Sequence, residues 1–337
     1  MLQLLRWKDW GYSKIPPFFT AGFLFLLTNE LPAAQSLFRF GAWLLFCAAF
    51  LAFGYGVNDF ADRDADRRAG KPNAMLGLGT ASAVAWLLAL IALSIVGLIP
   101  YLADWRLVTT VACSYAAGFA YSVPPFRLKE RGVAGLVSCA VAQRSLPVLV
   151  GAALFGRFDR HLWLYCALFT LVGLRWILLH QVIDAHHDET SGVQTFVTAT
   201  GAGRSLFLMK KVVFPLELAA LSAWLISISL AFPALWLLAP VYVLILRFLG
   251  YLWQRRWPPS NWTKYWLHPL SGFYEVLCPF FIGILTSVRN PVALPFLVLL
   301  AIWLAPREAP RLALLRHLLM ERFGHGKVLD TETSSGA

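Results

Sequence analysis

Runs of about 20 apolar residues recur along almost the whole chain, and this repetition limits the possible folds more than any other feature. Backbone polar groups cannot stay unpaired in lipid, so each run is expected to cross a membrane as an α-helix. The 337 residues are 58% hydrophobic and have a mean hydropathy of +0.63, which is unlike a soluble globular domain. The sequence therefore predicts an all-α, polytopic membrane protein.

The apolar runs predict nine spans. Their approximate bounds are 16–32, 37–57, 79–101, 106–122, 133–155, 162–183, 211–232, 234–251 and 273–289. The run at 291–305 is short for a crossing, so it is either a tenth helix or a continuation of the ninth past Pro291. Residues 1–305 are expected to form the membrane domain. Residues 306–337 are expected to form a basic tail, with an amphipathic helix at the membrane surface followed by a disordered end.

Lysine and arginine gather in alternate loops, which indicates the orientation of the chain. With the N-terminus inside, most of them fall in the N-terminal segment and in the loops after the second, fourth, sixth and eighth spans. The opposite loops contain Arg39, Arg106, Arg157 and Arg160. The net charge of +11 is thus spread over loops at one membrane face, which favours anionic lipids over nucleic acid as a partner.

A row of acidic residues marks the end of the second predicted span. In the stretch NDFADRDADRRAGKPN, Asn58, Asp62 and Asp66 follow one another at intervals of four, with Asp59 beside them. On a continuing helix the three residues share one face over roughly 12 Å. The predicted topology places this row on the cytoplasmic side.

A second row follows at the end of the sixth predicted span, in HQVIDAHHDETSG, where Asp184 and Asp188 repeat the spacing of four. Carboxylates placed so close repel one another by roughly 1 kcal/mol per pair in water. Mg²⁺ would offset this repulsion, because it binds carboxylate oxygens together with the phosphates of a substrate. Two such rows facing one cavity could hold two Mg²⁺ ions and a diphosphate between them.

The first row resembles the NDxxDxxxD motif of the UbiA-type intramembrane prenyltransferases, and the second resembles the DxxxD motif of the same family. A third stretch, YSVPPFRLKER at 121–131, resembles the YSxPP loop of several branches of that family. The resemblance implies a bundle of nine helices around a cavity open to lipid. It also implies Mg²⁺-dependent transfer of a prenyl group from an allylic prenyl diphosphate to an unidentified, small-molecule or lipid acceptor, aromatic acceptors among them.

By the same match, Asn58, Asp62 and Asp66 would hold one Mg²⁺ and Asp184 and Asp188 the other, with Asp59 assisting. The chain departs from the family at Trp176 and His180, where many members have Tyr and Lys. It also reads Lys71-Pro72-Asn73 after the first motif, where many members have Arg before Pro. These departures bear on the choice of substrate more than on the metal chemistry.

Cationic and aromatic side chains near the motifs are the other candidates. A diphosphate leaving group needs positive charge, and Lys71, Arg127 and Lys129 are the loop cations closest to the motifs in sequence. Arg175 lies inside a predicted span, where a cation is costly and usually faces a partner or a cavity, so it is a fourth candidate for contact with the diphosphate. Aromatic faces shield a carbocation, a role open to Tyr121 and Trp176. His180 precedes Asp184 by one turn and could contact phosphate or act as a base.

Three other functions remain open. A terpene cyclase of the same family would quench the carbocation within the donor, and a related branch moves a phosphoribosyl group onto a polyprenyl phosphate. Both would use the same acidic rows. A cation transporter is a more distant alternative, because it would need its carboxylates near the middle of the bilayer rather than at span ends.

Overall fold

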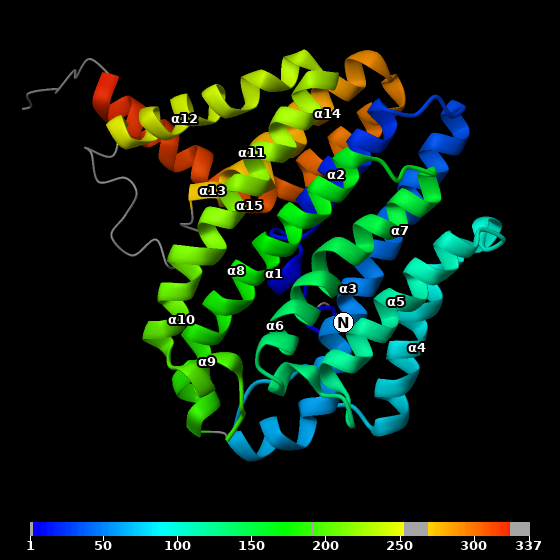
Figure 1. Cartoon of the computed structure of the whole chain (residues 1–337), viewed down its shortest axis with the longest axis vertical. Coiled ribbons are helices and arrows are strands. Elements are labelled where there is room, and N and C mark those ends of the chain that lie inside the picture. The colour runs from blue at the N-terminus through cyan, green and yellow to red at the C-terminus, as the bar shows by residue number, and fades with distance from the viewer. Residues whose placement is uncertain (1–2, 191, 253–268, 324–337) are drawn as a thin grey trace, which may run out of the picture.

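The computed structural model describes residues 3–190, 192–252 and 269–323. Within these ranges every regular element is a helix, so the predicted all-α class is confirmed for the part of the chain that is described. The long helices run up and down beside one another in a single bundle (Figure 1). The C-terminal ends of the third and eighth helices, which carry the two acidic rows, lie at the same end of this bundle, at the bottom of Figure 1.

The helices of the first half are α1 (Trp7–Trp10), α2 (Ile15–Leu27), α3 (Ala33–Ala69), α4 (Thr80–Val96), α5 (Trp105–Ser122), α6 (Val133–Ala140) and α7 (Leu146–Phe155). Those of the second half are α8 (Arg160–Thr190), α9 (Phe196–Thr200), α10 (Ala202–Leu208), α11 (Phe214–Ala231), α12 (Leu238–Leu252), α13 (Pro269–Gly272), α14 (Cys278–Arg289) and α15 (Leu294–Phe323). Three π-helical turns join α6 to α7, α10 to α11 and α13 to α14 without a break in direction.

Six helical stretches among the described residues are long and apolar enough to cross a membrane. They are Ala33–Ala69, Val133–Phe155, Arg160–His186, Ala202–Ala231, Leu270–Arg289 and Pro291–His317. Shorter apolar helices occur at Ile15–Leu27, Thr80–Val96 and Pro233–Leu249. The chain is therefore an integral membrane protein, whereas the number of nine crossings and the cytoplasmic position of the acidic rows stay predictions.

The last predicted span is a separate helix. α14 ends at Arg289, and the Asn290 side chain accepts a hydrogen bond from the Val292 backbone N–H (3.2 Å). Pro291 has no N–H to continue the hydrogen bonding of α14, so the chain restarts as α15. α15 runs through residue 305, the predicted domain boundary, and on to Phe323. The end predicted to be disordered, 328–337, lies outside the described residues.

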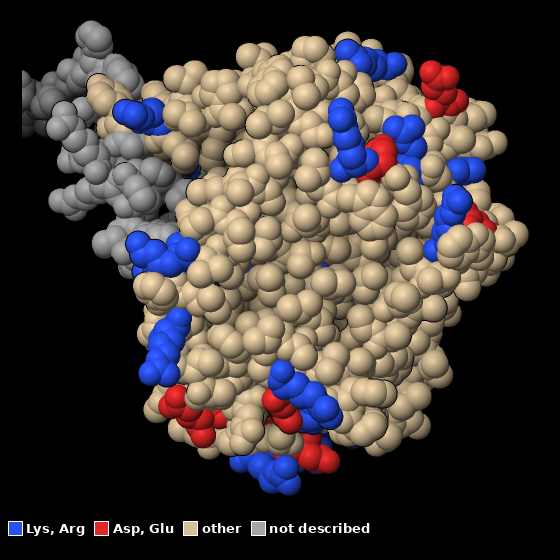
Figure 2. Space-filling model, in the orientation of Figure 1, with Lys and Arg blue, Asp and Glu red and all other residues tan. Residues whose placement is uncertain are grey.

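The outer surface of the bundle is apolar between its two charged ends. Figure 2 shows most of the Lys, Arg, Asp and Glu of the visible face toward its two ends, with a broad band of other residues between them and some Lys and Arg along the left edge. Large side chains such as Leu88, Leu230, Leu244 and Ile302 lie exposed on this outer surface. Exposed apolar area of this extent is costly in water and suits contact with lipid chains.

Tight packing fixes α3, whose last turns carry the first acidic row. The buried Trp43 indole N–H donates to the Pro147 carbonyl of α7 (2.7 Å). A Cβ at Gly151 would lie 2.6 Å from the Trp43 ring, so only glycine lets the two helices approach this closely. The position of the acidic row is therefore set by the rigid core rather than by a loop.

Candidate active site

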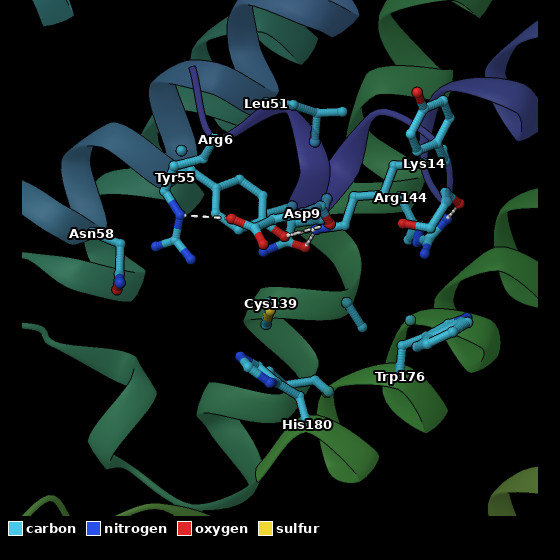
Figure 3. A pocket seen from close by; sticks show the side chains of 18 of the residues that line it. Arg6, Asp9, Lys14, Leu51, Tyr55, Asn58, Cys139, Arg144, Trp176 and His180 are labelled. Carbon is cyan, nitrogen blue, oxygen red and sulfur yellow. Dashed lines mark hydrogen bonds and ion pairs between the residues drawn. The ribbon is translucent and has the colours of Figure 1, made fainter. Parts of the chain in front are cut away.

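A cavity of about 460 Å³ opens in the middle of the bundle. The middle turns of α3 and α8 form two of its walls. The rest of the lining comes from two residues of α5, the turn between α6 and α7, the N-terminal segment before α2, and residues of α15. Figure 3 shows the side chains that line it. Because the walls come from both halves of the chain, the cavity exists only in the folded bundle.

The cavity reaches the start of each acidic row. Asn58, the first member of the α3 row, lines the cavity, and so does His180, one turn before Asp184 on α8. In Figure 3, Asn58 lies at the left of the cavity and His180 below it, on two different helices. Asp62, Asp66, Asp184 and Asp188 are not among the lining residues, so the structure places these carboxylates beyond its rim, on later turns of the same two helices.

The oxygen atoms of Asn58 and Asp62 converge on one positive charge. The Lys129 ammonium donates to Asn58 Oδ1 (3.1 Å) and to Asp62 Oδ2. Arg127 Nη2 donates to Asp62 Oδ1 (3.1 Å), and Ser122 Oγ donates to Asn58 Oδ1 (3.2 Å). Burial lowers the pKa of Lys129, and the charge of Asp62 opposes that shift. The predicted loop cations Arg127 and Lys129 therefore lie against the first acidic row.

The other two aspartates of this motif are also engaged. Asp59 is buried, and its Oδ1 accepts a hydrogen bond from Arg6 Nη1 (2.7 Å), while its Oδ2 has no hydrogen-bond partner. Asp66 Oδ2 accepts a hydrogen bond from the Asn73 amide (2.7 Å). Lys71 lies in the same loop, where its backbone N–H donates to the Asp66 carbonyl (2.9 Å). The loop after α3 thus folds back on the acidic row.

The second row lies at the C-terminal end of α8. Asp184 Oδ2 lies 3.6 Å from His180 Nδ1 on the same face of α8. Asp188 is buried, and its backbone carbonyl accepts a hydrogen bond from Val193 (2.9 Å) just after the helix ends. His180, which stands where many family members have lysine, is therefore close both to the cavity and to the first aspartate of its row.

The residues at this end of the cavity fit a hard divalent cation. Oxygen atoms of Asn58 and Asp62, one helical turn apart, both accept hydrogen bonds from the Lys129 ammonium. These oxygens therefore already hold a positive charge between them. In the described part of the chain, no three His, Cys, Asp or Glu side chains gather closely enough to hold a metal by themselves. A Mg²⁺ ion here would take amide and carboxylate oxygens and complete its shell with water or substrate phosphate.

Two predicted aromatic residues line the cavity wall. Tyr121, at the end of α5, and Trp176 of α8 both belong to the lining, together with the partly buried Tyr55 of α3. Their rings give the cavity an apolar, electron-rich surface. This surface suits a hydrocarbon chain and a developing carbocation.

Arg175 does not line the cavity, which corrects the expectation that it faces the diphosphate. Its guanidinium is 1% exposed and donates to both carboxylate oxygens of Glu217 on α11, at 2.6 and 3.1 Å. The Tyr274 hydroxyl donates to the same carboxylate (3.1 Å). This buried network holds α8 against α11 and the turn before α14, so we assign Arg175 a structural role.

Other polar residues of the cavity did not emerge from the sequence patterns. They are Arg6, Lys8, Asp9, Gln143, Arg144, Glu275, Arg307 and Arg311. Arg144 lies inside the apolar stretch Val133–Phe155, as Arg175 lies inside Arg160–His186. The argument that singled out Arg175, a cation inside a span, applies equally to Arg144 and would have found it.

Comparison with known proteins gives one family. The model of the UbiA prenyltransferase family matches residues 15–274. The chain is 28% identical over 156 residues to the chloroplastic chlorophyll synthase of Arabidopsis thaliana, a segment that covers 43% of this chain and 39% of that protein. It is 29% identical over 172 residues to the homogentisate phytyltransferase of a Synechocystis strain, covering 48% and 54%. The matched segments thus span about two fifths and about half of these two relatives.

Solved structures share the fold. A UbiA homolog from Archaeoglobus fulgidus, bound to DMAPP and Mg²⁺, aligns with a TM-score of 0.57 and 20% identity, over 85% of this chain and 99% of that one. The same homolog bound to GPP and Mg²⁺ gives the same values. At this level of identity the likeness concerns the arrangement of the helices.

Proposed function

Because the chain belongs to the UbiA prenyltransferase family, we propose that it transfers a prenyl group from an allylic prenyl diphosphate to an acceptor within the membrane and releases diphosphate. The binding of DMAPP, GPP and Mg²⁺ by structural neighbours supports a diphosphate donor and a divalent metal. The observation that carries the proposal is the convergence of Asn58 and Asp62 oxygens on one cation at the cavity.

Two Mg²⁺ ions are assigned to the acidic rows, one to Asn58, Asp62 and Asp66 and the other to Asp184 and Asp188. When bound, they would neutralise the charge that develops on the leaving diphosphate. Arg127 and Lys129 lie on a loop after α5 and are partly exposed, so both can turn from Asp62 toward phosphate oxygens. Lys71, in the loop after α3, is the third candidate for a phosphate contact.

The remaining walls of the cavity protect the reacting carbon. Tyr121 and Trp176 line the cavity, and their aromatic rings would stabilise positive charge on the allylic carbon. The apolar turns of α3 around Phe50 and Leu51 line the same space and exclude water from it. His180 lies near enough to the first row to accept a proton from the acceptor or to contact phosphate.

The position of the rows argues against the transporter alternative. Both rows begin at the cavity and continue to the ends of α3 and α8, rather than sitting at the middle of a span. The cyclase and phosphoribosyl alternatives use the same rows and are separated by their products.

The test is a product assay with purified protein in nanodiscs. Labelled DMAPP, geranyl, farnesyl and geranylgeranyl diphosphates are supplied with Mg²⁺, with and without aromatic acceptors, and both diphosphate release and labelled products are measured. We expect Mg²⁺-dependent transfer that stops with EDTA. A cyclic hydrocarbon formed without acceptor would favour the cyclase. In a separate reaction with phosphoribosyl diphosphate and a polyprenyl phosphate, transfer of the phosphoribosyl group to the polyprenyl phosphate with release of diphosphate would favour the third branch.

A further inference from the structure

The cavity has a second polar end, away from the acidic rows. Figure 3 shows Lys14 and Arg144 together on one side of the cavity and Asn58 on the other. Arg144 is 3% exposed and lies on the turn between α6 and α7, while Lys14 is 7% exposed and directly precedes α2. Both side chains line the cavity.

The two cations have neutral partners. Arg144 Nη1 donates to the Ser13 carbonyl (2.8 Å). Lys14 Nζ donates to the Tyr55 hydroxyl (2.7 Å) and to the Gln143 side-chain carbonyl, and it lies 4.6 Å from the centre of the Tyr55 ring. Among the described residues neither forms an ion pair with a carboxylate within 4 Å, although most other cations of the cavity do.

Those other cations are already neutralised. Arg6 pairs with Asp9 and Asp59, and Arg307 pairs with Glu275 and Glu308. Lys14 and Arg144 are thus two buried like charges whose hydrogen-bond partners are neutral, while the nearby carboxylates of Asp9 and Glu275 pair with Arg6 and Arg307 instead. Such an arrangement is costly unless a negative group enters the cavity.

Two anionic groups could enter the cavity. One is the diphosphate of the donor, and the other is an acid group carried by the acceptor. The donor diphosphate is assigned to the end with Asn58 and Asp62, where the loop cations Arg127 and Lys129 meet a carboxylate that can bind a metal. Lys14 and Arg144 lie across the cavity from this end (Figure 3). A group held there would be presented to the donor rather than be part of it.

We infer that Lys14 and Arg144 form a subsite for the carboxylate or phosphate group of the acceptor, so that the enzyme selects an acidic acceptor. This inference rests on the proposed transfer reaction. Arg144 supplies a planar pair of donors suited to a carboxylate or phosphate, and Lys14 supplies a point charge beside it. The Gln143 amide and the Tyr55 hydroxyl fix the ammonium in place.

The experiment measures binding of small probes to the purified protein by calorimetry. Benzoate and phenyl phosphate carry the two candidate anions, and benzamide is the neutral analogue of the same shape. We expect at least one anion to bind about tenfold more tightly than benzamide, because a charged hydrogen-bonded pair is gained. In Arg144→Gln this preference should disappear, and in Lys14→Gln it should weaken.

The matched control is Arg311→Gln, which removes a cavity-lining arginine that is more exposed and pairs with Glu308. It should keep the preference for the anion. Arg144→Lys, which keeps the charge, should keep part of it and serves if the glutamine variant does not fold. Binding of pyrophosphate with Mg²⁺ is measured for all variants and should stay within about twofold of wild type, since it uses the other end.

Two results would overturn the inference. One is wild-type protein that binds neither anion more tightly than benzamide. The other is Arg144→Gln that loses affinity for Mg²⁺-pyrophosphate as much as for the anion probe, which would assign these cations to the donor. Failure of the proposed function would look different, because wild type itself would then show no Mg²⁺-dependent binding of pyrophosphate.

Discussion

The two polar ends of the cavity hold their positive charges in different ways. At the end with the acidic rows, Lys129 and Arg127 come from a loop, are 11% and 25% exposed, and rest on the carboxylate of Asp62. At the other end, Lys14 and Arg144 are more deeply buried, lie at a helix start and in a helical turn, and contact only neutral groups in the described structure.

This difference indicates two tasks. Loop cations that contact a carboxylate can leave it to a metal ion and turn to a phosphate instead. A site that binds and releases diphosphate requires such a change. Fixed, buried cations cannot rearrange in this way and offer the same geometry to every ligand. We therefore interpret the first end as the site where diphosphate leaves the donor, and the second end as the site that selects the acceptor.

The largest effect is expected from Asp62→Ala, which breaks the first end alone. Turnover should fall by about a thousandfold, because a carboxylate that carries the metal and the loop cations is removed. Binding of benzoate at the second end should not change. Asp64→Ala is the matched control, since Asp64 is exposed on the same helix and pairs only with Arg67. Equal loss in both variants would contradict the assignment.

The second prediction concerns Glu217→Gln. This substitution removes the carboxylate that pairs with Arg175 and leaves Arg175 without an ion pair, as Arg144 already is. Arg175 sits in no ligand cavity, so an unpaired charge there should lower the free energy of unfolding by about 3 kcal/mol. Thermal denaturation in detergent measures this loss, with Arg67→Gln on the surface as control. A variant as stable as wild type would show that buried, unpaired cations are tolerated anywhere in this bundle.

Lys129→Met tests whether the Lys129 ammonium gives way to Mg²⁺ at the first end or only contacts the donor phosphate. The ammonium competes with a metal for Asn58 and Asp62, so its removal should lower the Mg²⁺ concentration needed for half-maximal rate. It should also raise KM for the donor about tenfold, because a phosphate contact is lost. Arg131→Gln in the same loop, whose side chain donates to the Pro125 carbonyl, should change neither value. A higher Mg²⁺ requirement in Lys129→Met would refute the exchange.

The smallest effect is a pH dependence of the second end. Burial and the neighbouring Arg144 charge lower the pKa of Lys14 to about 7, while Asp9 and Cys139 nearby act in the opposite direction. Lys14 is therefore charged below that pH and loses its charge above it. Benzoate affinity should fall roughly fivefold as pH rises through this range, and a bound anion should shift the midpoint upward.

The control for this prediction is Lys14→Met, in which benzoate affinity should be low and flat across the same pH range. Calorimetric titrations in buffers of matched ionic strength provide the measurement. An unchanged slope in Lys14→Met would assign the pH dependence to another group facing the cavity, such as His180.

The sequence was sufficient for the helices and for the acidic rows, because both depend on local spacing. Runs of apolar residues predict spans, and intervals of four place Asn58 and Asp62 on one face of α3. The motifs suggested that Lys129 contacts the diphosphate site, but they did not predict its contacts with Asn58 and Asp62. Those residues lie 71 and 67 residues before it in the chain. The structure therefore supplies the geometry that the motif implies.

Pairings between distant residues could not be predicted in this way. Arg175 meets Glu217 42 residues later, and nothing in the spacing of either residue indicates the other. Arg6 reaches Asp59 across 53 residues for the same reason. The sequence also expected the aspartates themselves to line the cavity, whereas Asn58 and His180 line it, because the cavity lies one turn before Asp62 and Asp184.

A structure of the protein with Mg²⁺ and a non-hydrolysable prenyl diphosphate analogue tests the division of the cavity most directly. The account predicts diphosphate beside Asn58 and Asp62, with the Lys129 ammonium moved from Asp62 to a phosphate oxygen, and Lys14 and Arg144 left without phosphate. Diphosphate bound against Lys14 and Arg144, with Lys129 still on Asp62, would contradict it.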